Sequence, residues 1–217
     1  MHKQLISLGR LLLCCAIFLP HFLNDFFDLY VEDYAIWTIL DWSMRIGILF
    51  LIFFLYSKKE LSLADINIKY IGLTRTTIFY LILSISSILI LILQIYFQMR
   101  SAQCIYANPR PFNKNSILFP MDTYFGLFLV AVEEEVLFRG VMIFLLKKIT
   151  NNFYVILFIS SVLFGAAHWS IGIYNIIFNS IIGAIYFIAV WHTGSILPSA
   201  IAHFICNYFF SILIAAW

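Results

Sequence analysis

Charged residues are scarce in this chain: Asp, Glu, Lys and Arg make up 11% of its 217 residues, whereas hydrophobic residues make up 63%. Soluble domains carry about 25% charged residues. The shortage of charge therefore excludes an ordinary soluble protein and predicts an integral membrane protein. The formal net charge is only +2, and the sequence has no long run of like charges, so no nucleic-acid partner is expected.

Three local patterns are also missing. The four cysteines have no CxxC spacing, which argues against a cysteine-based metal or redox motif. The sequence contains no HExxH, the helical zinc signature. No small-residue cleavage site follows the first apolar run, so that run is predicted to be a retained helix and not a signal peptide.

Apolar stretches long enough to cross a bilayer fill most of the chain, since a span needs about 20 residues. The predicted spans are residues 4–23, 35–57, 77–98, 118–146, 153–171, 173–191 and 195–216. We therefore expect an all-α, polytopic membrane helix bundle of about seven or eight transmembrane helices. The eighth would be a partial helix within residues 60–76 or 101–117. So many spans leave no room for a soluble domain, and residues 1–217 are predicted to form a single integral membrane domain.

The polar residues of the first half have structural interpretations. Residues 24–33 are acidic and are predicted to form a short loop, and residues 57–76 a polar loop or surface-lying segment. His21 lies at the end of the first predicted span, where the membrane interface explains it. Asp41 and Arg45 lie four positions apart in the second span, so they share a helical face and can neutralise each other.

A cluster of charge in the fourth span points to function. Glu133, Glu134, Glu135 and Arg139 lie within residues 118–146. A charged side chain at the bilayer centre costs roughly 2.5–3.5 kcal/mol, so intramembrane charge is a functional-site hypothesis by default. Glu135 and Arg139 are four positions apart and are predicted to pair. Glu134 points about 100° away, which makes it the freer carboxylate and the candidate general base. Glu133 is assigned no role.

Two later spans supply polar side chains at a similar depth. His203 and Asn207 are four positions apart, so they present two hydrogen-bond donors on one face, as an oxyanion hole requires. His168 lies near the C-terminal end of the fifth predicted span, residues 153–171. With ~1.5 Å of rise per residue, these side chains and Glu134 fall in one layer of the bundle. We expect them to form a single site.

These residues together resemble a known family. Glu134-Glu135-x-x-x-Arg139, Phe164-x-x-x-His168 and His203-x-x-x-Asn207 occur in this order on successive predicted helices. They look like the motifs of the CPBP family, which comprises type II CAAX prenyl endopeptidases and related bacteriocin-processing or immunity proteins. The resemblance covers about residues 118–210, the expected protease-like motif core.

The resemblance implies an intramembrane endopeptidase that acts on a membrane-associated peptide or protein, either prenylated or carrying a leader peptide. By analogy, Glu134 and His168 would activate a water molecule, and His203 with Asn207 would stabilise the oxyanion. Glu135 and Arg139 would organise the site. The protein is expected to be an integral multi-pass protein of the bilayer, in the plasma membrane if the source is prokaryotic.

Alternatives remain at this point. Glu134, His168 and His203 are also suitable ligands for a catalytic zinc ion, although a metal-free mechanism, with no cofactor, also explains Asn207. A non-proteolytic immunity or peptide-binding membrane protein would keep the same architecture. A proton-coupled transporter is a further option, but no inverted repeat is visible in the sequence.

Overall fold

The computed structural model describes residues 8–100 and 117–215, and it contains helices and short connections with no strand in these two segments. The predicted all-α class is confirmed. The helices are α1 (Leu8–Tyr30), α2 (Tyr34–Ser57), α3 (Leu73–Arg100), α4 (Leu118–Met121), η1 (Asp122–Gly126), α5 (Leu127–Glu135), η2 (Val136–Met142), α6 (Ile143–Ile149), α7 (Phe153–Ala166), η3 (Trp169–Ile171), α8 (Ile173–Thr193) and α9 (Leu197–Ala215).

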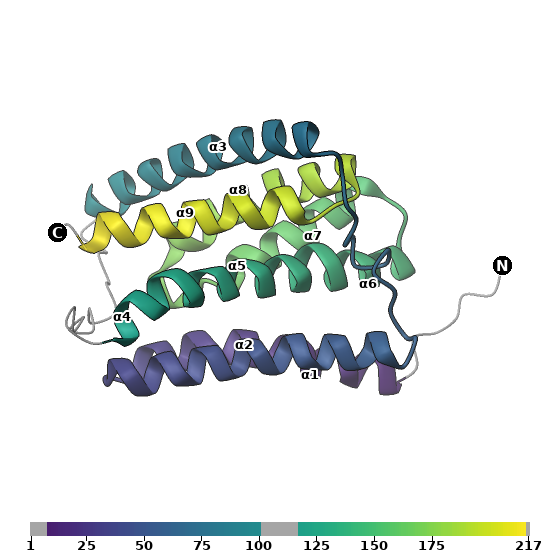
Figure 1. Cartoon of the computed structure of the whole chain (residues 1–217), viewed down its shortest axis with the longest axis horizontal. Helices are drawn as coiled ribbons and strands as arrows, with labels where there is room; N and C mark the ends of the chain where they lie inside the picture. Colours follow the sequence, from purple (N-terminus) through teal and green to yellow (C-terminus); the bar gives the residue numbers. More distant parts are fainter. Residues whose placement is uncertain (1–7, 101–116, 216–217) are drawn as a thin grey trace.

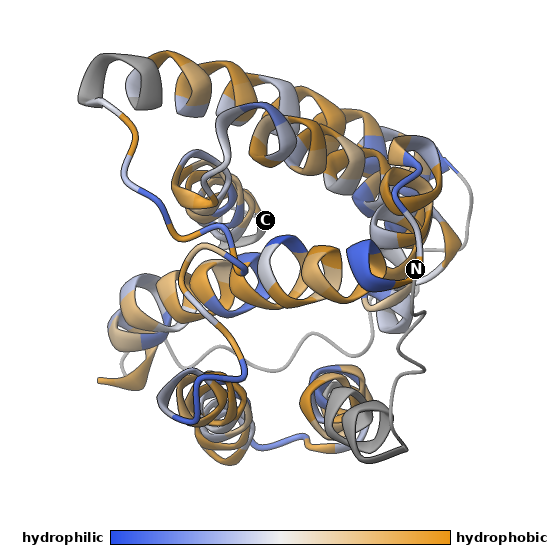
Figure 2. Ribbon diagram, turned by 90° about the vertical axis from the view of Figure 1, so that its right-hand side faces the viewer, coloured by the Kyte–Doolittle hydropathy of each residue, from blue (hydrophilic) through white to orange (hydrophobic). Residues whose placement is uncertain are grey.

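Three helices are long and apolar enough to cross a membrane: residues Tyr34–Ser57, Thr77–Arg100 and Ile173–Thr193. Two shorter apolar helices, Phe153–Ala166 and Leu197–Leu213, accompany them. Large apolar side chains face outward along the bundle, for example Phe50, Phe158 and Leu89. Figure 2 shows apolar residues along most of the helices and hydrophilic ones mainly in the connections. The structure is therefore that of a helical membrane bundle.

The helix that carries the glutamates lies in the middle of the bundle (Figure 1). Helices α1 and α2 pack together on one side of it, and α3, α8 and α9 lie on the other. Helix α5 contacts both α2 and α9, while α7 packs on α8. Polar side chains on α5 can therefore meet partners from both halves of the chain.

The central helical unit, residues 118–149, includes two π-helical segments, η1 and η2. Such segments are uncommon and occur frequently at functional sites. Within η2, Gly140 lies against Ile66: a Cβ atom built on Gly140 would come within 3.0 Å of the Ile66 carbonyl oxygen and Cβ. The absence of a side chain at position 140 thus lets the segment between α2 and α3 approach the central helix.

Two predicted loops are revised by the structure. Residues 24–30 belong to α1, which ends at Tyr30, so the predicted acidic loop at 24–33 is reduced to residues 31–33. Asn24 is buried and its amide donates to Asp41 of α2, which explains why the helix continues. The segment between α2 and α3 does not simply lie on the surface, because the Asn67 side chain donates to the carbonyl oxygen of Arg139 at 2.8 Å.

Candidate active site

Three consecutive buried carboxylates form the centre of the site. Glu133, Glu134 and Glu135 are 0%, 3% and 0% exposed at the end of α5. Successive residues of a helix point about 100° apart, so the three side chains extend in different directions. Each carboxylate therefore meets its own set of partners, and the three have different roles in the site.

Glu134 faces two histidines with one oxygen. Its Oε2 lies 3.7 Å from Nε2 of His168 and 3.7 Å from Nε2 of His203. This oxygen is buried and has no hydrogen-bond partner within the described part of the chain. The structure thus brings Glu134, His168 and His203 together around one carboxylate oxygen, at separations longer than a direct hydrogen bond.

His168 lies just beyond a helix and not inside one. Helix α7 ends at Ala166, so the predicted span 153–171 is too long at its C-terminal end. The Nδ1 atom of His168 lies 2.9 Å from the carbonyl oxygen of Phe164. A carbonyl only accepts, so Nδ1 carries the hydrogen, and in the neutral imidazole Nε2 has its lone pair on the side of Glu134.

Further contacts hold the segment that carries His168 from two sides. Asp25 of α1 accepts a hydrogen bond from the hydroxyl of Ser170 at 2.8 Å. Asn175 of α8 donates to the carbonyl oxygen of His168 at 2.9 Å, and Gln94 of α3 donates to Asn175 at 2.6 Å. Helices α1 and α8 therefore hold this short connection directly, and α3 supports it through Asn175.

His203 is held by the third glutamate. Its Nδ1 lies 3.1 Å from Oε1 of Glu135, and Nη1 of Arg139 lies 3.3 Å from the same oxygen. The predicted pair of Glu135 and Arg139 is therefore confirmed, and His203 is an additional partner. The guanidinium of Arg139 lies 3.9 Å from the centre of the Phe164 ring, a cation–π contact that also connects η2 to α7.

Asn207 lies one turn beyond His203 on α9 and is half-buried. It forms no hydrogen bond to any other residue in segments 8–100 and 117–215. Its amide shares a helical face with His203, and among the described residues it makes no hydrogen bond to Glu134. Its predicted role in an oxyanion hole therefore stays a prediction.

A comparison with known protein families gives a match to the part of the chain that carries most of this site. Residues 116–209 match the family model described as type II CAAX prenyl endopeptidase Rce1-like. The predicted resemblance is confirmed over this segment, which we call the Rce1-like domain after the family that it matches. The matched family is one of endopeptidases, which are hydrolases. No curated protein and no solved structure matches the chain.

Two residues outside the Rce1-like domain also reach the glutamates. Arg45 of α2 donates to Glu133 at 2.7 Å and to Glu134 at 3.2 Å, in addition to its predicted partner Asp41 at 2.8 Å. His21 of α1 lies 3.2 Å from Glu133 and is buried, so its predicted place at the interface is wrong. Its burial follows from the continuation of α1 to Tyr30, which the sequence did not indicate.

Glu133 is not incidental, contrary to the expectation from the sequence. It is fully buried, and its Oε2 faces both Arg45 and His21. The polar character of α2 was visible in the sequence as Asp41 and Arg45. The packing of α2 against α5, which brings Arg45 to Glu133, could not be predicted, because a hydrophobic pattern does not specify which helices pack together.

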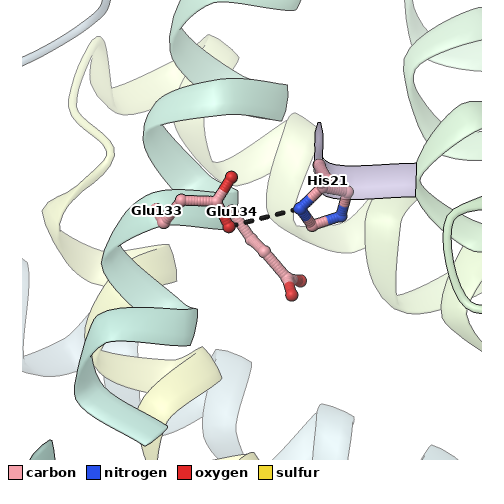
Figure 3. A group of neighbouring side chains, drawn as sticks. All are labelled: His21, Glu133 and Glu134. Carbon is pink, nitrogen blue, oxygen red and sulfur yellow. Dashed lines mark hydrogen bonds and ion pairs between the residues drawn. The ribbon is translucent and has the colours of Figure 1, made fainter. Parts of the chain in front are cut away.

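One group among the described residues has the spacing of metal ligands: His21, Glu133 and Glu134, whose ligand atoms lie within 4.8 Å of one another (Figure 3). It differs from the predicted set of Glu134, His168 and His203. The guanidinium of Arg45 already lies between Glu133 and Glu134, so a cationic group compensates the first set. The second set, in the Rce1-like domain, retains donor atoms of the types that zinc binds.

Proposed function

We propose that the chain is an intramembrane endopeptidase that hydrolyses a peptide bond of a membrane-associated peptide or protein. The observation that supports this most directly is the position of Glu134 Oε2, 3.7 Å from Nε2 of both His168 and His203. A prenylated C-terminal peptide is the first substrate class to test, and a leader peptide is the second. Residues 1–217 would form one multi-pass domain in the plasma membrane of a prokaryote.

Glu134 acts as the general base in this proposal. A water molecule between Glu134 and His168 gives one proton to the carboxylate while its oxygen attacks the scissile carbonyl carbon. The lone pair on His168 Nε2 accepts the second hydrogen bond and orients the water. Glu134 then returns the proton to the leaving amine as the tetrahedral intermediate collapses, so the peptide bond breaks and the base is regenerated.

His203 and Asn207 stabilise the oxyanion. Glu135 only accepts at His203 Nδ1, so that nitrogen carries a hydrogen. Donation from Nε2 as well requires the imidazolium form, whose charge Glu135 balances. The Asn207 amide supplies a second donor from the same face of α9. Arg139 acts indirectly, because it holds Glu135.

The same residues also support a zinc-dependent alternative. Glu134, His168 and His203 would hold the ion, which would activate the water and polarise the carbonyl. The metal-free mechanism is preferred because it assigns a function to Asn207, which is not among these ligands.

A cleavage assay in liposomes tests the proposal. Purified protein would be reconstituted with a fluorogenic membrane peptide, prepared with and without a prenyl group. Glu134→Gln should reduce cleavage by about 10²- to 10⁴-fold, the usual contribution of a general base. The control is Glu32→Gln, which changes an exposed glutamate between α1 and α2. Cleavage by Glu134→Gln at the wild-type rate would refute the proposal, and so would a wild-type protein that binds these peptides without cleaving them.

A further inference from the structure

Arg45 connects the N-terminal half of the chain to the glutamates of the Rce1-like domain. Its Nε donates to Asp41 of its own helix, and its Nη1 donates to Oε2 of Glu133 and Oε1 of Glu134. One guanidinium from α2 thus binds three carboxylates on two helices. The family match begins at residue 116, so it does not include this arginine.

The charge balance of the buried site depends on this residue. Besides the histidines, the ionisable groups buried there are four carboxylates and two arginines: Asp41, Glu133, Glu134, Glu135, Arg45 and Arg139. Arg139 pairs with Glu135. Arg45 is the arginine within ion-pair distance of the remaining three carboxylates. Its planar guanidinium has several donors in a fixed arrangement, whereas a lysine ammonium would present a single point of charge.

Arg45 also sets the orientation of Glu134. It holds Oε1 of this carboxylate, and the other oxygen, Oε2, is the one that faces His168 and His203. A quarter-turn of the carboxylate about its last carbon–carbon bond would break the contact with Arg45. The arginine therefore fixes the plane of the group, so that one of its two equivalent oxygens faces the two histidines.

His21 strengthens this arrangement through Glu133. Its Nδ1 contacts the Glu133 oxygen that also accepts from Arg45. Figure 3 shows His21 directed at Glu133, while the Glu134 side chain extends away from this contact. Glu133 thus accepts from Nη1 while Asp41 accepts from Nε, and the two contacts together keep the guanidinium in place beside Glu134.

We propose that Arg45 is a positioning residue for peptide-bond hydrolysis, and that α2 supplies to the site a group that the Rce1-like domain itself lacks. The inference rests on the proposed function, because it assigns Arg45 to the orientation of the general base Glu134. It goes beyond that function in making the N-terminal helices necessary for turnover and not only for folding.

The test compares Arg45→Lys and Arg45→Ala with Trp42→Phe in the liposome assay. Trp42 lies on the same helix, and its indole nitrogen donates a 3.0 Å hydrogen bond to Asp122 of η1 and not to a glutamate. A misplaced reacting group can cost about 10²-fold in rate. We expect Arg45→Ala to lose about that factor in kcat and Arg45→Lys about tenfold, each with KM within about twofold, because orientation affects turnover more than binding.

Chemical rescue separates positioning from folding. Added guanidinium should restore part of the kcat of Arg45→Ala and none of that of Glu134→Gln. Arg45→Lys keeps a buried cation, so it decides the question if Arg45→Ala does not fold. A wild-type kcat in Arg45→Lys, or an equal loss of kcat in Trp42→Phe, would overturn the inference. Wild-type cleavage by Glu134→Gln would instead refute the proposed function, whatever the Arg45 variants show.

Discussion

The Nδ1 atom of His203 lies 3.1 Å from Oε1 of Glu135, at the contact between α9 and the central helix. An ionised carboxylate accepts hydrogen bonds and does not donate them, so this contact fixes the hydrogen on Nδ1. It also directs Nε2 toward Glu134. Glu135 therefore orients an imidazole that belongs to a different helix and, as a carboxylate, favours the tautomer with the hydrogen on Nδ1.

Glu135→Gln should impair turnover more than binding. A glutamine has nearly the same shape, but it cannot balance an imidazolium at His203 or the guanidinium of Arg139. We expect kcat to fall about 10²-fold, comparable to the loss of one oxyanion donor, with little change in KM. Steady-state kinetics with the fluorogenic peptide measures both. An unchanged kcat would show that His203 does not need the charge of Glu135.

Glu133→Ala should destabilise the fold, in contrast to the sequence-based expectation that its loss would matter least. The substitution leaves the buried Arg45 and His21 without their shared carboxylate. Arg45 keeps Asp41 and Glu134, whereas His21 loses its partner, and a buried polar group left unsatisfied costs about 1–3 kcal/mol. Denaturant unfolding in detergent would measure the free energy of unfolding. Glu32→Ala, at an exposed position, is the control and should leave it unchanged.

Gly140→Ala should weaken the contact between η2 and the segment before α3. The new methyl group would meet the backbone of Ile66 at about 3.0 Å, and a backbone oxygen cannot move aside easily. Overpacking of this kind costs about 1–3 kcal/mol. Gly47→Ala is the matched control, because its Cβ would meet nothing within 4 Å. A glycine in an exposed helix interior is less stable than alanine by up to about 1 kcal/mol, so this second variant should gain stability.

Asp25→Asn should slow cleavage through His168. Asp25 accepts from Ser170, two residues after His168, and an amide oxygen is a weaker acceptor than a carboxylate. We expect kcat to fall several-fold, up to about tenfold, since the effect is indirect. Asp33→Asn is the control: Asp33 caps α2, and asparagine caps a helix equally well. Equal rates for Asp25→Asn and wild type would show that the other contacts suffice to hold His168.

Chelation distinguishes the two mechanisms. Under the metal-free mechanism, dialysis against a strong chelator should leave the cleavage rate unchanged. Loss of cleavage that added zinc restores would establish the zinc-dependent alternative. Metal analysis of the purified wild type and of His168→Ala, which removes one candidate zinc ligand, would show whether any bound zinc depends on this histidine.

The sequence predicts the helices and the residues of the site better than it predicts the contacts between residues of different helices. Hydropathy placed α2 and α8 within two residues of their observed ends, and the four-residue spacing paired Glu135 with Arg139. These signals are local. The contacts of Arg45 and His21 with the glutamates depend on how α1 and α2 dock on α5, which no local pattern specifies. His168 lies outside its helix for a similar reason, since contacts from α1 and α8 fix that segment.

The contacts of Arg45 have a consequence for biosynthesis. Helix α2 carries its own counter-charge, since Asp41 and Arg45 pair within one turn, so it can enter a bilayer before the rest of the chain exists. The central helix emerges later with three glutamates and a single arginine, and it is not neutral on its own. Its insertion is therefore expected to require that α2 has been inserted first. The assembly of the site then depends on the order in which the helices are synthesised.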